Sequence, residues 1–573
     1  MKWTDAQQSA IDAPRPGQLP SQTILVSAAA GSGKTAVLVE RMIQRLKRRE
    51  LSIQELMVVT FTKAAAAEMK ARIGVKLAEE FQATGDTYLE EQLNMLPSAH
   101  ISTLHSFCQW VIRSYFYKLD IDPSFTIGNE GELALMRYDV LDTILLQAYE
   151  QGLYNIYDVS DMFSTERSDQ ILRETVFQIY NFALAQSQPM RWLDQVCHTY
   201  ESALHQTLLE TTWGTLFWKE QQRQIEYLLE RYEEAQRLAT LGNGFDKWME
   251  KVSELQTLLQ AMQKADTWDA MHVGVVGIGG FSFPVLRATK AMNESDPAIL
   301  SEIKAILAEG KEILQAMPKG VFAITEADWR EQMEYLVPLV RGIIGLVKRF
   351  HEDFQRAKQE AGMIDFSDLE HLCLALLVDA ESTEELKPSE VALELQDTFK
   401  EVMVDEYQDT NGVQEAIVNL VSRGDNRFYV GDVKQSIYGF RMADPQLFME
   451  KYHRFDHDVN GVERRIDLSQ NFRSHEAILN VTNFIFSQIM TDEGAGLTYG
   501  EAEALHTGRI VEEAPPEWVG GDVEVHVLCC DEDKAQTDPE DGEDLENDEK
   551  EMLFVIRKIQ ELKNNGAMVQ DKD

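Results

Sequence analysis

The chain has 573 residues, 44% of them hydrophobic and 26% charged, which is typical of a globular protein with more than one core. A formal net charge of −42 excludes a passive nucleic-acid coat, which would be basic, although a motor can still hold nucleic acid in a local groove. No apolar run is long enough to span a membrane and the start has no signal-peptide pattern, so we expect a cytoplasmic protein.

The first informative feature is a run of small residues between a predicted strand and a predicted helix. The apolar run Ile24–Ser27 predicts a buried strand, and residues 36–43 have the apolar spacing of a helix. Between them stand Ala28, Ala29, Ala30, Gly31, Ser32, Gly33, Lys34 and Thr35. Small residues let backbone N–H groups turn toward phosphate oxygens, and the helix start adds partial positive charge. We therefore expect a nucleotide site in which Lys34 reaches the β- and γ-phosphates and Thr35 ligates Mg²⁺.

The next 330 or so residues change in character part of the way along. Up to residue 116, short strands such as Met57–Thr60 alternate with helices, which is typical of a parallel α/β sheet. Residues 117–361 are dominated by long amphipathic stretches and predict a mainly helical insertion. We interpret the tryptophans of this insertion as core anchors rather than base-stacking platforms. The glycine-rich residues 272–283 lack the spacing of a dinucleotide fingerprint and predict a loop.

The α/β pattern resumes after residue 361. Strands are predicted at Glu401–Val404 and Arg427–Val430. A further unit is predicted from residue 456, with strands at 466–469 and 522–528 and helices at 475–489 and 550–563. Residues 531–551 are almost entirely acidic and predict a solvated loop.

Two carboxylates directly follow the predicted strand Glu401–Val404. A Mg²⁺ ion that bridges two phosphates needs a carboxylate opposite the threonine of the phosphate loop, and Asp405 fits that position. Its neighbour Glu406 can orient and deprotonate the attacking water. Together with Lys34, this pair predicts hydrolysis of a nucleoside triphosphate.

Six motifs follow one another in the order found in superfamily 1A DNA helicases. Residues 404–411 (VDEYQDTN) resemble the DEXQDT signature, and residues 3–11 resemble the N-terminal glutamine motif. Four further segments resemble two DNA-contacting motifs and the third and fourth helicase motifs, at residues 60–69, 102–107, 430–441 and 468–474. The chain is identified on these motifs as a member of the UvrD-like helicases of this superfamily.

Sequence details narrow the resemblance to the RecB/AddA branch, and within it to AddA subunits of bacterial AddAB helicase–nucleases. Residues 60–66 read TFTKAAA where Rep- and UvrD-like helicases usually have TFTNKAA, and residues 104–106 read LHS where those helicases have FHG. The helical insertion is also longer than theirs. The resemblance covers the whole chain but only the front part of an AddA protein. We therefore expect an N-terminal portion without the later helicase motifs and the nuclease domain.

The resemblance implies an α/β fold built on a RecA-like P-loop NTPase motor domain. Residues 1–116 and 362–455 would form this first motor domain, 117–361 its mainly helical insertion, and 456–573 the incomplete start of a second RecA-like domain. ATP and Mg²⁺ would be the cofactors. The activity implied is that of an ATP-dependent 3′→5′ DNA helicase, which processes double-strand ends for recombinational repair on the nucleoid together with its partner AddB. Exonuclease activity would come from the part beyond this chain, which alone should hydrolyse ATP poorly.

The resemblance also implies roles for single residues. Gln7 would read adenine and Phe472 would stack on it, while Gln435 would couple the γ-phosphate to the DNA site. Arg473 would offset charge on the transferring phosphoryl group, although a surface salt bridge is the alternative. The expected DNA contacts are Phe61, Thr62, Lys63, His105, Tyr438, Phe440 and Arg441. The aromatic side chains of that set would stack on bases, unless they belong to the core.

Two other functions stay open on the sequence. One is a UvrD/Rep-type repair helicase without a nuclease, which sequence beyond residue 573 would distinguish. The other is a helicase-like scaffold without enzymatic activity. The scaffold is disfavoured because a protein without catalysis has no need to keep Lys34, Thr35, Asp405, Glu406, Gln435 and Arg473 together.

Overall fold

A computed structural model gives the fold of the chain as two compact units. It describes residues 3–14, 22–119, 121, 125–163, 168–281, 288, 290–293, 297–383, 385–491, 496–508, 523–528 and 547–567. The first unit, here the sheet unit, combines Met1–Gly128, Leu184–Ser187 and Gly362–Asp573. The second, the helical unit, combines Asn129–Ala183 and Gln188–Ala361.

A six-stranded parallel sheet organises the sheet unit. Its strands run in the order β3-β2-β6-β7-β1-β8, so consecutive strands of the chain are joined by crossovers. Their bounds are β1 Thr23–Ala28, β2 Leu56–Thr60, β3 His100–Thr103, β6 Glu401–Val404, β7 Arg427–Gly431 and β8 Glu463–Leu468. The α/β fold expected from the alternating pattern is thereby confirmed, and the carboxyl ends of these strands meet at one edge.

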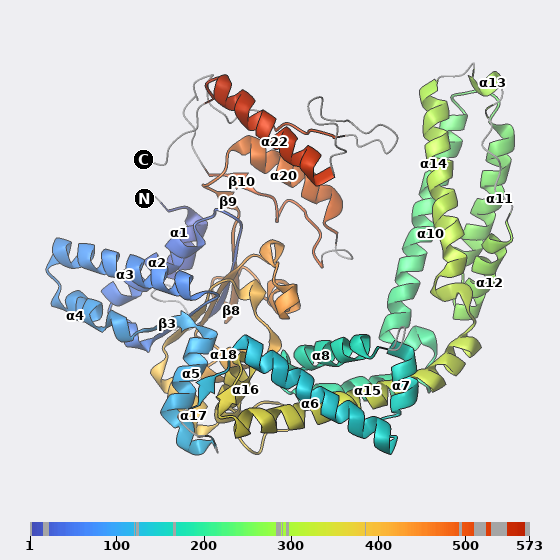
Figure 1. Cartoon of the computed structure of the whole chain (residues 1–573). Helices are drawn as coiled ribbons and strands as arrows, with labels where there is room; N and C mark the ends of the chain where they lie inside the picture. The colour runs from blue at the N-terminus through green and yellow to red at the C-terminus, as the bar shows by residue number, and fades with distance from the viewer. Residues whose placement is uncertain are drawn as a thin grey trace. The chain divides into compact units, whose positions relative to one another are not determined.

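Both faces of this sheet are covered by helices (Figure 1). Side chains alternate along each strand, so Leu25 enters one core while Ile24 and Val26 enter the other. The core with Ile24 includes helices α1 Asp5–Asp12, α2 Lys34–Lys47, α3 Lys63–Thr84 and α4 Thr87–Met95. The core with Leu25 includes α5 Leu104–Tyr115, α16 Phe366–Leu377, α17 Glu390–Thr398, α18 Gly412–Val421 and α19 Gln446–Arg454. Burial on both faces explains why these strands read as continuous apolar runs.

Strand β8 corrects one part of the sequence interpretation. The sequence pattern places the strand at residues 466–469 in a second domain that begins at 456, whereas β8 pairs with β1 along its whole length, with Ile466 opposite Val26. Ile466 and Leu468 join the core of α1 and α2. The sequence shows that a segment suits a strand, but it does not show which sheet receives it, because pairing depends on distant residues.

The remaining short elements of the sheet unit lie outside the main sheet. Two pairs of parallel strands join β4 Thr126–Ile127 to β5 Met363–Ile364 and β9 Gln470–Asn471 to β10 His506–Thr507. Helices α20 Glu476–Ile489 and α22 Asn547–Asn564 confirm two predicted helices. Residues 523–528 form no strand, which corrects that prediction. The predicted acidic loop lies outside the described residues except for 547–551, which belong to α22 rather than to a loop.

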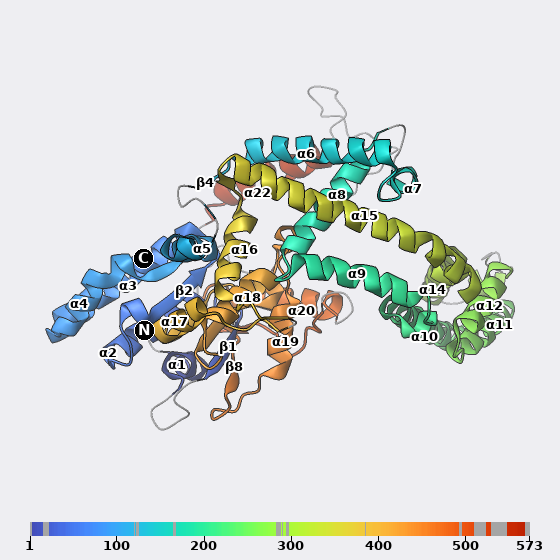
Figure 2. The ribbon, with the colours of Figure 1, turned by 90° about the horizontal axis from the view of Figure 1, so that it is seen from below.

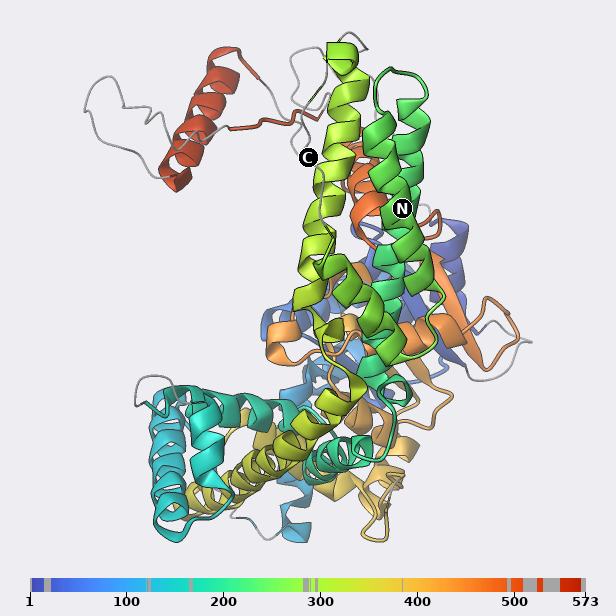
Figure 3. The same ribbon diagram turned by 90° about the vertical axis from the view of Figure 1, so that its right-hand side faces the viewer.

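The helical unit consists of two groups of helices. Figure 2 shows α6 Glu130–Gln151 beside the long helix α15 Glu326–Glu360, and α9 Pro189–Ala203 also packs on α15. The second group is the upright bundle of Figure 3, with α10 Thr212–Ala239, α11 Asp246–Gln263, α12 Trp268–Gly279 and α14 Pro297–Ala316. Short helices complete the unit at α7 Ile156–Phe163, α8 Gln170–Leu184 and α13 Lys290–Asn293.

The core of the bundle settles two sequence interpretations. Trp248 and Trp268 are buried in it, which confirms that these tryptophans are core anchors. The glycine-rich residues 272–283 are not a loop up to Gly279, because they continue α12. Met271, Val275 and Ile278 share one buried side of that helix. Packing of this apolar stripe outweighs the low helix propensity of glycine. Among the described residues, the helices are too short or too polar to cross a membrane.

Candidate nucleotide site

The phosphate loop connects β1 to α2 at the carboxyl edge of the sheet. Gly31 and Gly33 adopt left-handed backbone angles, with φ of 69° and 85°, and Gly33 is the N-cap of α2. A side chain at Gly31 would be excluded even without that strain. Its Cβ would lie 2.9 Å from the Cβ of Arg473 and 2.8 Å from Nδ2 of Asn471. These angles turn the loop around a helix N-terminus, which is a ready site for anions.

The carboxylates that follow β6 face the lysine of this loop. Lys34 Nζ lies 3.0 Å from Oε2 of Glu406, in a partly buried ion pair. Glu406 itself has a left-handed φ of 53°, an uncommon backbone angle for a residue with a side chain. Burial raises the pKa of Asp405 to about 6, and the negative charge of Glu406 adds to that shift while Lys34 opposes it. The site thus holds more negative charge than one lysine balances.

This donor set fits a magnesium ion held jointly with phosphates. Mg²⁺ is usually held by one or two carboxylates together with substrate oxygens, rather than by a cage of protein ligands. In agreement with that, no cluster of three or more His, Cys, Asp or Glu suited to a metal occurs in the described part of the chain. Asp405 offers a buried carboxylate, and Thr35 stands in the first turn of α2.

A chain of side-chain hydrogen bonds leads from Lys34 to the third motif. Gln408 Nε2 donates to Glu406 Oε2 at 2.9 Å, and Gln408 Oε1 accepts from the backbone N–H of Asp432 at 3.0 Å. Gln435 Nε2 in turn donates to Oδ2 of Asp432 at 2.7 Å. Gln435 is therefore joined to the carboxylates through two intermediate residues.

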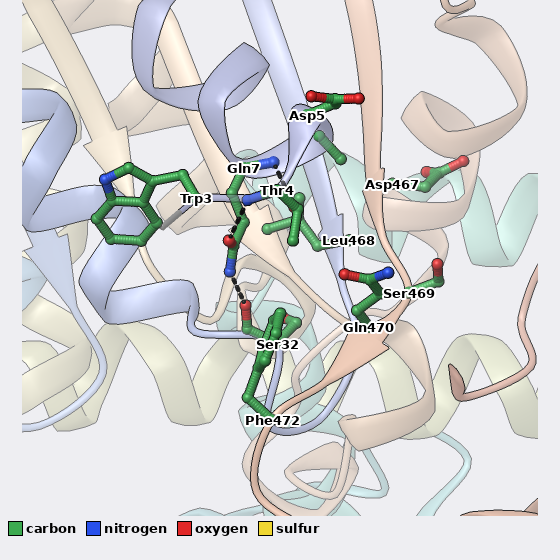
Figure 4. Close-up of a pocket in the computed structure, with 11 residues that line it drawn as sticks. Trp3, Thr4, Asp5, Gln7, Ser32, Asp467, Leu468, Ser469, Gln470 and Phe472 are labelled. Atoms are coloured by element: carbon green, nitrogen blue, oxygen red, sulfur yellow. Dashed lines mark hydrogen bonds between the residues drawn. The ribbon is translucent and has the colours of Figure 1, made fainter. Parts of the chain in front are cut away.

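A cavity of about 430 Å³ opens beside the phosphate loop (Figure 4). The N-terminal helix α1 contributes one wall through a capping box, in which Thr4 and Gln7 each accept the other's backbone N–H. From there the amide of Gln7 donates to the carbonyl of Ser32 at 2.9 Å. The cavity is lined by Trp3, Thr4, Asp5, Ala6, Gln7, Ser32, Asp467, Leu468, Ser469, Gln470 and Phe472.

The segment after β8 crosses the phosphate loop. Asn471 Nδ2 donates to the carbonyl of Ala30 at 2.7 Å, and the backbone N–H of Phe472 donates to the carbonyl of Gly31 at 2.9 Å. The backbone N–H of Ala29 donates back to the carbonyl of Leu468 at 3.0 Å. These contacts bring Phe472 to the cavity and the Cβ of Arg473 to Gly31, with the side chain of Arg473 exposed.

An aromatic cluster stands at the same edge of the sheet. Phe61 and Tyr438 have ring centroids 4.3 Å apart, and Phe440 lies 5.7 Å from Tyr438. The guanidinium carbon of Arg441 lies 5.5 Å and 5.6 Å from the centroids of those last two rings. Phe440 is 73% exposed, so it is not a core residue. Thr62 caps α3 by accepting the N–H of Ala65, and exposed Lys63 begins that helix.

His105 has different surroundings from the aromatic cluster. Its Nε2 lies 3.3 Å from Oε1 of Glu370, and its ring packs edge-on to Phe366. Burial and the nearby charge of Lys63 lower the pKa of His105. Burial raises the pKa of Glu370 to about 7, although Gln414 donates a hydrogen bond to it. At neutral pH, His105 is therefore an uncharged ring beside a buried acid.

Sequence reasoning gave no role to four residues that the structure places in the site. Gln408 and Asp432 carry the hydrogen-bond chain, and Asn471 fastens the crossing segment to the phosphate loop. Asp409 is buried beside Gln408, and burial raises its pKa to about 6. All four stand inside the quoted motifs, so their position was a signal, but their bonding partners are distant in sequence.

Comparison with known proteins gives a consistent family. The model of the UvrD/REP helicase N-terminal domain matches residues 3–319 and 344–456. A relative from Anoxybacillus flavithermus is 36% identical over 580 residues, with all of this chain and 47% of the relative covered. Relatives from Geobacillus kaustophilus and Geobacillus thermodenitrificans are each 38% identical, with all of this chain and 46% of each relative covered. All three are named as the AddA component of an ATP-dependent helicase/nuclease. The chain spans about half the length of the curated relatives it matches.

Proposed function

Because the chain belongs to the UvrD/REP helicase N-terminal domain family, we propose that it is the ATP-driven DNA motor of an AddA-type helicase–nuclease. In this proposal the whole protein unwinds DNA ends in the 3′→5′ direction so that they can be processed for recombinational repair. Its partner is AddB, and its place of action is the nucleoid. Full-chain similarity to proteins named as helicase/nuclease components supports this choice over a repair helicase without a nuclease.

One observation carries the proposal, namely the meeting of three sequence segments around the phosphate loop. Lys34 of the loop pairs with Glu406 after β6, and residues 471–473 cross the loop from the other side. A scaffold without catalysis would gain nothing from burying Asp405 where its ionised form is disfavoured.

In the proposed mechanism ATP lies along this edge of the sheet. Phe472 stacks on adenine while the amide of Gln7 recognises it, and backbone N–H groups of residues 28–35 bind the phosphates. Asp405 and Thr35 hold Mg²⁺, which neutralises charge on the phosphates. Glu406 then accepts a proton from the attacking water.

Further residues complete the proposed cycle. Lys34 and Arg473 offset the charge that develops on the transferring phosphoryl group. Gln435 senses the γ-phosphate and passes a change at the carboxylates to the third motif, a route supported by its link to Glu406 through Gln408 and Asp432. The domain division proposed here keeps the first motor domain interrupted by the helices of residues 117–361. The second motor domain begins after β8.

We propose that the aromatic cluster holds the tracking strand. Phe61, Tyr438 and Phe440 offer ring faces to bases, a contact that tolerates any sequence and suits a translocating motor. Thr62, Lys63 and Arg441 contact the DNA backbone, and His105 orients groups that do so. The strong negative charge of the whole chain makes such local contacts necessary.

The proposal is tested by magnesium-dependent ATP binding, followed by hydrolysis with and without single-stranded DNA. The wild-type chain should bind ATP in the presence of Mg²⁺, and Asp405→Asn should lose the magnesium dependence while keeping the fold. Asp397→Asn, outside the site near the start of β6, is the control for a lost carboxylate. ATP binding that ignores both Mg²⁺ and Asp405 would contradict the proposed mechanism.

A further inference from the structure

A buried arginine outside the sequence motifs fixes the phosphate-loop helix to the central sheet. Arg41 lies on α2, and its side chain is only 2% exposed. Its Nε donates to Oε1 of Glu401, at the start of β6, at 2.8 Å. Its guanidinium carbon also lies 4.2 Å from the ring centroid of Phe428. Burial of a charge is costly unless it is paired and hydrogen-bonded, and Glu401 meets that requirement.

The same guanidinium holds the end of helix α1. Arg41 Nη1 donates to the carbonyl of Ala10 at 2.8 Å and also to the carbonyl of Ala13. Carbonyls at a helix C-terminus have no partner within the helix, and a cation there also stabilises the helix dipole. One side chain thus ties together the end of α1, the middle of α2 and the start of β6.

The opposite end of α1 forms a wall of the cavity beside the phosphate loop. Thr4, Asp5, Ala6 and Gln7 line that cavity, and Gln7 bonds to Ser32 of the loop. Since α1 has only eight residues, a shift of its C-terminal end displaces Gln7 as well. The capping box fixes Gln7 within α1, but it does not fix α1 to the sheet.

We propose that Arg41 is a positioning residue for recognition of the base. It sets the distance between the helix that reads adenine and the loop that binds the phosphates. This inference rests on the proposed function, in which Gln7 recognises the adenine of ATP. Loss of Arg41 should therefore weaken binding of adenine nucleotides selectively, because the phosphate loop keeps its own contacts with residues 468–473.

The chain offers a matched control in Arg45, one turn further along α2. Arg45 Nη1 donates to the other oxygen of Glu401 at 2.9 Å, and Nε donates to Glu50 at 2.9 Å. Neither of these partners belongs to α1. Arg45→Met therefore removes a similar charge from the same carboxylate without releasing the helix that carries Gln7.

The test compares ATP and GTP as competitors of a fluorescent ATP analogue, on the whole chain with Mg²⁺. The wild type should prefer ATP. Loss of the helix-end hydrogen bonds in Arg41→Met should weaken ATP binding about tenfold and change GTP binding less than about twofold. Arg45→Met should preserve the wild-type preference.

Equal weakening of both nucleotides by Arg41→Met, or no weakening, would overturn the inference. If that variant does not fold, Arg41→Lys decides, because lysine keeps the charge near Glu401 but not the planar fork; it should show the same selective loss. A wild-type chain that binds no ATP contradicts the proposed function itself. A wild type that binds ATP without preference contradicts adenine reading by Gln7, and the inference then falls with it.

Discussion

The two units bury very different side chains. In the helical unit the buried polar or charged residues among those described are Thr211, Gln221 and Lys358, and the core of the bundle consists of aliphatic and aromatic side chains. In the sheet unit many polar groups are buried, and they gather near the carboxyl edge of the strands. Among them are Gln7, Arg41, Glu401, Gln408, Asp409, Asp432 and Asn471.

This difference separates stability from chemistry within one chain. Buried polar groups are costly unless each finds a partner, so a fold retains them where they perform a task. The helical unit gains stability from apolar burial alone, whereas the sheet unit accepts carboxylates with raised pKa values beside its phosphate loop. Substitutions in the two units should therefore have opposite signatures.

The largest effect expected is on the stability of the helical unit. Trp268 is buried, stacks on Phe322 with centroids 4.1 Å apart, and donates Nε1–H to the carbonyl of Ile324 at 3.0 Å. Trp268→Ala should destabilise this unit by about 3–5 kcal/mol, as measured by chemical denaturation. ATP affinity should not change. A parallel loss of ATP binding would break the comparison.

Lys34→Ala should have the reverse signature. Removal of the ammonium that pairs with Glu406 should slow ATP hydrolysis by on the order of 10²–10³-fold, because charge on the phosphoryl group is no longer offset. The melting temperature should change little. Lys47→Ala is the control on the same helix, since Lys47 makes only a half-exposed ion pair with Glu80. Hydrolysis retained in Lys34→Ala would contradict the proposed site.

Glu370 should show the cost of a buried acid through its pH dependence. Its pKa is raised from 4.5 to about 7, so the folded state loses stability as pH rises through that window. Glu370→Gln should be more stable than the wild type by about 2–3 kcal/mol at pH 8, and by less than about 1 kcal/mol at pH 5. Glu390→Gln, at an exposed position, should show no such pH dependence in urea unfolding.

The smallest expected effect concerns DNA. Phe440→Ala should weaken binding of single-stranded DNA by about 1–2 kcal/mol through lost base stacking, without a change in melting temperature. Ile437→Ala is a matched control because Ile437 is 70% exposed but has no aromatic face. Equal loss of affinity in both variants, measured by fluorescence anisotropy, would show that the contact is merely apolar.

Local patterns gave much of the fold. The strands at residues 24–27, 57–60, 401–404 and 427–430 all occur, since fully buried strands show as short apolar runs. Errors came from segments whose state depends on distant partners. Residues 272–279 became helix because α12 packs in the bundle, and residues 523–528 did not become a strand. The helix of residues 547–564 was correctly predicted from its own periodicity.

For the candidate site, the sequence supplied the chemical groups without their connections. Glycines at 31 and 33 were read from the motif, and their left-handed angles explain why that loop needs them. The link from Glu406 to Gln435 through Gln408 could not be read, because hydrogen-bond geometry is a property of the folded chain. The environment of His105 was equally hidden, since Glu370 lies far away along the chain.

The amino-acid sequence by itself determined that a phosphate loop, two carboxylates and a later arginine occur in helicase order, because each is set by residue type and spacing. Only the tertiary structure decided that β8 joins the first sheet and that Arg41 ties α1 to α2. Both depend on which distant groups become neighbours when the sheet forms, and burial then fixes those neighbours because an unpaired polar group inside the protein is too costly.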